Sequence, residues 1–131
     1  MSRSEIQVKA VPYNFGPLRD AHGNARLAGP CGDTMEFWIR VQFPYLDTVA
    51  YTTDGCGHSI LSGYAAAAIA EDLSLDQALE MQPEAVLKEI GGLPGESAHC
   101  ALLAVNTLKA AIRDYLARQA RAAHPQPAAS P

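Results

Sequence analysis

The chain has 131 residues, which is enough for one domain with a buried core. Hydrophobic residues make up 48% of it, which excludes a disordered chain, and the net charge of −4 argues against a nucleic-acid-binding protein, which needs a basic face. No apolar run approaches the roughly 20 residues of a membrane-spanning helix, and the first residues lack the apolar core of a signal peptide. We therefore expect a cytoplasmic protein with reduced thiols and with neither nucleic-acid nor membrane partners.

The first 30 residues carry weak patterns. Residues 6–10 alternate as in a short extended segment, and the Gly, Pro, Asp and Asn content of residues 14–29 indicates loops, with a turn at 20–24. We expect a short strand at residues 25–28.

Residues 34–43 give the clearest strand pattern, because apolar and polar side chains alternate along it. The residues expected on the buried face are Met35, Phe37, Ile39, Val41 and Phe43. A turn at residues 44–47 and a second strand at 48–53 complete an antiparallel hairpin. With the short strand beside it, the hairpin predicts a small three-stranded antiparallel sheet.

Helical patterns follow the hairpin. They cover residues 59–72, 74–81, 83–90 and 97–121. Ser74 with Gln77 forms a capping-box pattern, and Gly91-Gly92 ends the third helix. Strands followed by helices predict an α+β fold with the helices on one face of the sheet. We expect a single domain over residues 1–121 and a disordered Pro/Ala tail over 122–131.

All three cysteines lie where a loop meets a regular element. They occur in Gly29-Pro30-Cys31-Gly32-Asp33, Asp54-Gly55-Cys56-Gly57-His58 and Ser97-Ala98-His99-Cys100. Antiparallel pairing of the hairpin places the start of one strand, after Cys31, beside the end of the other, before Cys56. Cys56 and Cys100 also lie near helix N-termini, where the dipole favours a thiolate. An odd number of thiols fits a metal site or a reactive thiol better than a disulfide framework.

Three thiolates and one further ligand suit zinc or an iron–sulfur cluster. Asp33 is either a fourth or exchangeable ligand, or a turn residue that caps the backbone after Gly32. His99 is either a ligand or a solvent-facing residue, and we interpret His58 as a surface residue at a helix N-terminus. The cysteines are spaced too far apart for a zinc finger, so small buried cysteines without a metal stay open as an alternative.

In order along the chain, the three segments resemble the Cys-Gly-Asp, Gly-Cys-Gly and His-Cys motifs of the NifU/IscU family of iron–sulfur cluster assembly scaffolds. The resemblance covers about residues 14–116. It implies a small α+β scaffold of the IscU/NifU N-terminal type that is not an enzyme. It also implies iron binding, sulfur supply by a cysteine desulfurase, assembly of a [2Fe–2S] cluster, and transfer of that cluster to apo iron–sulfur acceptor proteins.

By motif position, the resemblance implies that Cys31, Cys56 and Cys100 are the cysteine ligands and sulfur acceptors. Asp33 and His99 would be exchangeable ligands of the cluster or would assist its release. Family members also hold zinc in the same pocket, so zinc is a second metal implied for this site.

The chain departs from the family at two places. Residues 93–97 read Leu-Pro-Gly-Glu-Ser where the best-known scaffolds have Leu-Pro-Pro-Val-Lys, which argues against recognition by the dedicated Hsp70-type chaperone. Residues 5–13 replace the usual N-terminal helix, so we expect docking to the desulfurase to differ.

Two other functions stay open. One is a zinc-binding sulfurtransfer partner of a cysteine desulfurase, as in SufU-type proteins. The other is a thiol enzyme that uses Cys100 with His99 and Asp33. A thiol enzyme needs one nucleophile with a base, and this does not account for three cysteines at three loop ends.

Overall fold

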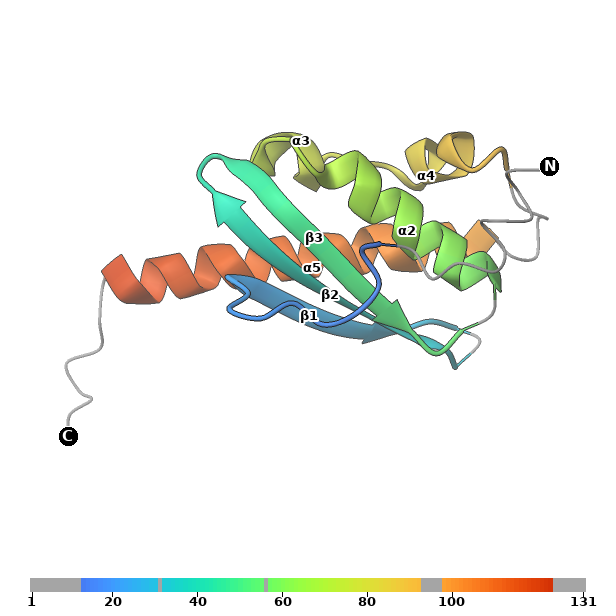
Figure 1. The fold of residues 1–131 in the computed structure, drawn as a ribbon, viewed down its shortest axis with the longest axis horizontal. Coiled ribbons are helices and arrows are strands. Elements are labelled where there is room, and N and C mark those ends of the chain that lie inside the picture. Colours follow the sequence, from blue (N-terminus) through green and yellow to red (C-terminus); the bar gives the residue numbers. More distant parts are fainter. Residues whose placement is uncertain (1–12, 31, 56, 93–97, 124–131) are drawn as a thin grey trace.

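The computed structural model describes residues 13–30, 32–55, 57–92 and 98–123. In these segments one antiparallel sheet has the strand order β1–β2–β3, and four helices follow it along the chain (Figure 1). The elements are β1 (Gly23–Ala28), β2 (Thr34–Gln42), β3 (Tyr45–Thr53), α2 (Gly57–Ala70), α3 (Leu75–Leu79), α4 (Pro83–Glu89) and α5 (Ala98–Ala123). The predicted α+β class with a three-stranded antiparallel sheet is confirmed.

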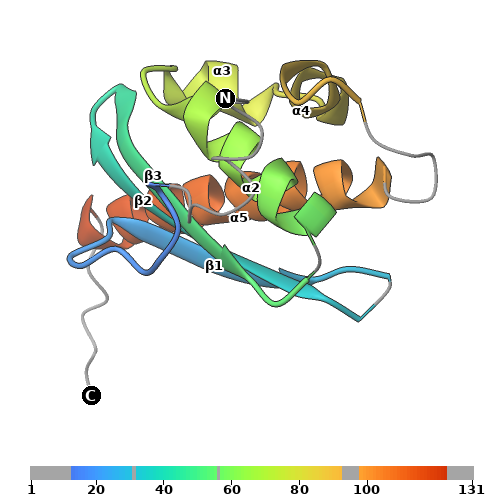
Figure 2. The same ribbon diagram turned by 45° about the vertical axis from the view of Figure 1, so that its right-hand side comes forward.

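The helices cover one face of the sheet. The long helix α5 packs against β1 and β2, and α2 packs against both β3 and α5 (Figures 1 and 2). Alanines on α2 permit this close packing, since Ala65, Ala66, Ala67 and Ala70 are fully buried. The core therefore lies between the sheet and the pair formed by α2 and α5.

The buried face of β2 is confirmed at Met35, Phe37 and Ile39, which are at most 1% exposed. The prediction is wrong for Phe43, which is 74% exposed. A register shift between Arg40 and Val41 interrupts the alternation, and β2 ends at Gln42. The predicted turn at 44–47 is also wrong, because β3 already begins at Tyr45 and the connection is correspondingly shorter.

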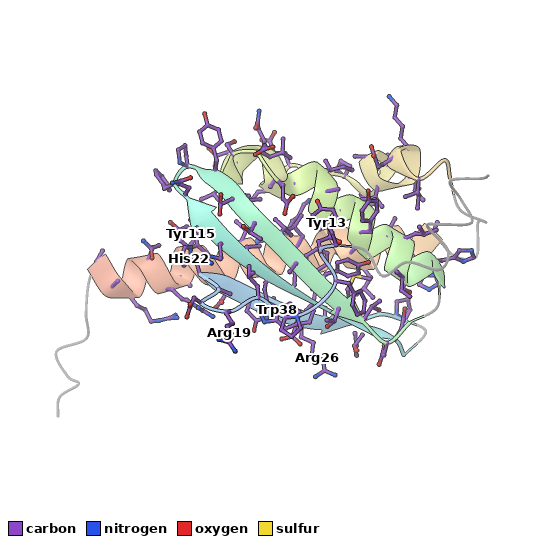
Figure 3. All side chains as sticks on the ribbon, viewed as in Figure 1. Tyr13, Arg19, His22, Arg26, Trp38 and Tyr115 are labelled. Carbon is purple, nitrogen blue, oxygen red and sulfur yellow. The ribbon has the colours of Figure 1, made fainter. Side chains whose placement is uncertain are left out.

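The strand β1 begins earlier than predicted and includes two residues of the expected turn, Gly23 and Asn24. Contacts with α5 explain the extension. The backbone amide of Asn24 donates to Asp114 Oδ2 at 2.9 Å, and a Cβ on Gly23 would lie 2.4 Å from a backbone oxygen of α5. Figure 3 shows His22, just before β1, beside Tyr115 of α5, with ring centroids 6.5 Å apart.

The predicted helix ends are correct to within two residues where the structure describes them. The capping box is confirmed, since the Ser74 hydroxyl accepts from the Gln77 amide and the Gln77 side chain accepts from the Ser74 amide. Gly91 and Gly92 have positive φ angles at the end of α4, as expected for such a helix end. No helix of the described segments is both long and apolar enough to span a membrane.

Four predictions concern residues outside the described segments. They are the extended segment at 6–10, the departure from the family at 5–13 apart from Tyr13, the departure at 93–97, and all but the first two residues of the tail. The division into a domain over 1–121 and a tail over 122–131 stays a prediction, and α5 itself continues to Ala123.

Candidate functional site

The three cysteine-bearing segments meet at one end of the molecule. The loop between β1 and β2, the connection from β3 to α2, and the start of α5 all lie at this end (Figure 2). Cys31 and Cys56 are outside the described residues. Of the five predicted ligands, the structure therefore places Asp33, His99 and Cys100.

Main-chain hydrogen bonds hold the turn between β1 and β2. The Gly29 amide donates to the Asp33 carbonyl at 2.7 Å, and the Gly32 amide donates to the Gly29 carbonyl at 3.0 Å. These two bonds fix the residues that flank Cys31 in the sequence without using the Asp33 side chain. The Asp33 carboxylate is consequently available for other contacts.

The segments before Cys56 and after Cys31 are tied to each other. The Thr34 amide donates to Asp54 Oδ1 at 2.7 Å, and the Thr53 hydroxyl donates to the Thr34 carbonyl at 2.7 Å. The hydrogen bond from the Thr34 amide is the main cause that holds the pKa of Asp54 below its ordinary value. Two of the cysteine-bearing segments are thus joined at the sheet end, as the hairpin geometry predicted.

A buried hydroxyl links Asp33 to Cys100. Ser59, in the first turn of α2, donates to Asp33 Oδ2 at 2.9 Å, and its Oγ lies 3.4 Å from Cys100 Sγ. Ser59 is fully buried and Cys100 is 2% exposed. The structure therefore brings together two predicted ligands that are far apart in the sequence, one from the sheet and one from α5.

The other carboxylate oxygen of Asp33 is buried and has no hydrogen-bond partner among the described residues. Leaving a charged oxygen unpaired in this way costs free energy, and a cation would relieve that cost. The expected alternative, in which Asp33 caps the backbone after Gly32, would instead require a backbone donor at this side chain. An oxygen beside a thiol is a donor set that suits zinc or iron.

Gly55, just before Cys56, allows this close packing. A Cβ at Gly55 would lie 2.4 Å from Ser59 Oγ and 2.9 Å from Asp33 Oδ2. Real Cβ atoms do not approach other atoms so closely, so any larger residue would displace either the hydroxyl or the carboxylate. The glycine is therefore part of the arrangement that holds Asp33.

His99 lies at the same end, with Nε2 at 3.9 Å from Cys100 Sγ. His58, in the first turn of α2, is partly exposed, and its interpretation as a surface residue stays a prediction. Within the described segments, which exclude Cys31 and Cys56, no three potential ligands are grouped closely enough to hold a metal ion. A metal site at this end would therefore require ligands from outside these segments, and the ligand roles of Cys31 and Cys56 stay predictions.

Sequence reasoning missed Ser59. Its signal was a polar residue placed on the buried face of an alanine-rich helix, three positions after a cysteine. A buried hydroxyl in such a place usually has a specific hydrogen-bond partner. The partners, Asp33 and Cys100, come from other elements, and only the fold reveals them.

Comparison with known proteins identifies related chains. The family model described as "NifU-like N terminal domain" matches residues 6–122. The iron-sulfur cluster assembly scaffold protein IscU of Aquifex aeolicus is 35% identical over 113 residues, covering 84% of this chain and 72% of its own length. Iron-sulfur cluster assembly scaffold protein IscU 1 of Archaeoglobus fulgidus is 32% identical over 111 residues, with the same two coverages.

Solved structures share the fold. A putative iron-sulfur cluster assembly scaffold protein for the SUF system, from Fervidobacterium islandicum, has a TM-score of 0.64 at 15% identity and covers 86% of this chain and 96% of its own. A NifU-like N-terminal protein from Brucella abortus has a TM-score of 0.62 at 17% identity, with coverages of 81% and 87%. These structures support the fold, and the sequence matches show the family. The chain belongs to the family of NifU-like N-terminal domains.

Proposed function

We propose that this chain is an iron–sulfur cluster assembly scaffold. It accepts sulfur from a cysteine desulfurase, binds iron, assembles a [2Fe–2S] cluster as its cargo and transfers the cluster to apo-proteins. The observation that carries the proposal is the contact of Asp33 and Cys100 with one buried hydroxyl, at the end of the molecule where the other two cysteine segments meet. The scaffold names of the relatives from Aquifex aeolicus and Archaeoglobus fulgidus support it.

The donor set suits a cluster that must leave. Thiolates from Cys31, Cys56 and Cys100 bind iron strongly, whereas a carboxylate oxygen binds it more weakly and exchanges more easily. Asp33 offers an oxygen that has no protein partner among the described residues. His99, adjacent to Cys100 and with its ring near Sγ, is the second exchangeable ligand or assists release.

Three cysteines at three loop ends fit a scaffold better than a thiol enzyme, which needs one nucleophile with a base. The His99 ring lies 3.9 Å from Cys100 Sγ, but that pair alone leaves Cys31 and Cys56 without a role. The relatives named above carry the name of scaffold proteins. We therefore propose that the chain binds and transfers its cargo without enzymatic turnover.

The proposed partners are a cysteine desulfurase and apo iron–sulfur acceptor proteins, in the cytoplasm. Residues 93–97 lack the second proline and the lysine of the chaperone-binding segment in the best-known scaffolds, so cluster release is proposed to occur without the dedicated Hsp70-type chaperone. A zinc-binding sulfurtransfer partner of a desulfurase is the competing function, because the same thiol and carboxylate donors also suit zinc.

Anaerobic reconstitution with ferrous iron, cysteine, a cysteine desulfurase and an excess of a thiol reductant, which supplies the electrons that convert persulfide sulfur to sulfide, tests the proposal. We expect the visible absorbance of a [2Fe–2S] cluster to appear, and the cluster to pass to an apo-ferredoxin. Bound zinc is measured on the same sample before and after reconstitution. Zinc that stays tightly bound while no cluster absorbance develops would reject the scaffold and favour the zinc-binding sulfurtransfer partner.

A further inference from the structure

One oxygen of Asp33 is held by Ser59 and the other is not. Oδ2 accepts the Ser59 hydroxyl at 2.9 Å and would also lie 2.9 Å from a Cβ on Gly55, so it is enclosed on two sides. Oδ1 is also buried, 3.0 Å from where a Cβ on Gly29 would lie, but it has no hydrogen-bond partner among the described residues. The two oxygens are therefore not equivalent as metal ligands.

We propose that Ser59 is a positioning residue that reserves Asp33 Oδ1 as the single ligand oxygen for the metal. By occupying Oδ2, the hydroxyl keeps the carboxylate from binding through both oxygens and fixes its rotation. The inference rests on the proposed function, since it assumes that metal binds between Asp33 and the cysteines.

The hydroxyl also connects the carboxylate to the thiol. Ser59 Oγ lies 3.4 Å from Cys100 Sγ, and a hydroxyl has one hydrogen to donate and two lone pairs to accept with. The same oxygen therefore fixes how far Asp33 lies from the sulfur of a second ligand. Partners of this kind, which orient a ligand without touching the metal, typically change metal affinity by 10- to 100-fold when removed.

The position of the hydroxyl is set by α2 rather than by the loop that carries Asp33. Ser59 is fully buried in the first turn of this helix and packs against Gly55. A second serine provides a matched control. Ser62, one turn further along α2, is also fully buried, and its hydroxyl has no hydrogen-bond partner among the described residues.

Cobalt(II) titration of the apo-protein under anaerobic conditions tests the inference, because thiolate-to-cobalt charge transfer reports on the cysteines and the visible d–d bands report on coordination number. We expect Ser59→Ala to weaken cobalt binding about tenfold. The charge-transfer intensity per bound cobalt should stay unchanged, because the thiolate ligands are the same. The d–d intensity should fall, because a carboxylate that binds through both oxygens raises the coordination number above four. Ser62→Ala, which removes a buried hydroxyl from the same helix, should match the wild type.

A double-mutant cycle shows whether Ser59 acts through Asp33. Asp33→Ala should weaken cobalt binding, and adding Ser59→Ala to it should weaken binding no further. Wild-type affinity in Ser59→Ala, or an equal loss in both backgrounds, would overturn the inference. Wild-type protein that binds cobalt without a thiolate band would instead overturn the proposed function.

Asp33→Asn gives an independent test that does not depend on folding of the Ser59 variant. Asparagine has one carbonyl oxygen, which can accept from Ser59, and an amide nitrogen that is a poor ligand in the other position. We therefore expect Asp33→Asn to weaken cobalt binding as much as Asp33→Ala. Retention of wild-type affinity by Asp33→Asn would overturn the assignment of Oδ1.

Discussion

The Asp33→Ala variant should hold a bound cluster longer than the wild-type protein, although it should bind a single cobalt(II) ion more weakly. The carboxylate attracts a lone cation, whereas it repels a cluster that three thiolates make anionic. Asp33 adds a negative charge beside an anionic site, and its oxygen is a weaker ligand for iron than a thiolate. Two unit charges about 4 Å apart interact by about 4 kcal/mol at an effective dielectric constant of 20. A tenfold change in rate corresponds to about 1.4 kcal/mol, which is smaller than this repulsion, so we expect its removal to slow cluster loss at least about tenfold.

The same variant should change the stability of the apo-protein little. It removes one hydrogen bond to a charged group, worth about 1.5–3 kcal/mol, and also removes a buried oxygen without a partner, which costs about 1–3 kcal/mol. These contributions offset each other to within about 1 kcal/mol, or about 4 °C in Tm. The turn is retained because the Gly29 amide binds the Asp33 carbonyl rather than the side chain.

Cluster transfer to apo-ferredoxin, followed by visible absorbance, measures the loss rate, and thermal melting of the apo-protein measures stability. Asp54→Ala is the control, since that carboxylate accepts a backbone amide from Thr34. We expect this control to lower Tm without prolonging the life of the cluster. Faster cluster loss from Asp33→Ala together with a lowered Tm would refute the reasoning and show that Asp33 acts as a turn cap.

Other predictions follow from the same structure. Replacing any one cysteine with serine should abolish stable cluster binding, because a hydroxyl is a poor ligand for iron, and an unaltered cluster yield would remove that cysteine from the site. Cys100 should react with iodoacetamide far more slowly in the folded apo-protein than in urea, as mass spectrometry of its peptide can show. Gly63→Ala should destabilise the protein by about 1–3 kcal/mol in urea melts, because the new Cβ would lie 2.3 Å from the Tyr51 ring, and wild-type stability would contradict this close contact. Asp54 has a lowered pKa in the folded protein, so its contribution to stability is present above the unfolded pKa of 3.8 and is lost as the pH falls through the folded pKa. Asp54→Asn should therefore reduce the fall in Tm between pH 4 and pH 2. An unchanged fall in Tm would contradict the cause given for the pKa shift.

Local patterns predicted most of the fold. The alternation of Met35, Phe37 and Ile39 was enough to find the central strand, and the Ser74 capping box marked the start of a short helix. The prediction that Phe43 is buried was wrong because a register shift inside a strand leaves no reliable mark on the hydrophobic pattern. Gly23 was assigned to a turn because its close contact with α5 comes from the tertiary structure, which residue preferences do not contain.

The candidate site was predicted in part. The order of the three cysteine segments and the hairpin geometry placed their ends together, and the structure shows Asp33 and Cys100 linked at that end. The linking hydroxyl of Ser59 could not be assigned from the sequence. Its partners lie on a loop and on a helix far along the chain, so their convergence depends on how α2 and α5 pack.

The edge of the sheet formed by β3 limits how partner proteins can bind. Along β3, the Tyr51 amide donates to the Asn14 carbonyl, the Gly16 amide donates to the Tyr51 carbonyl, and Glu71 accepts from the Val49 amide. Exposed strand edges invite pairing with strands of other chains, and proteins commonly block them by covering segments. Because these backbone groups already have partners, a protein that docks along this part of β3 has to recognise side chains rather than add a strand to the sheet.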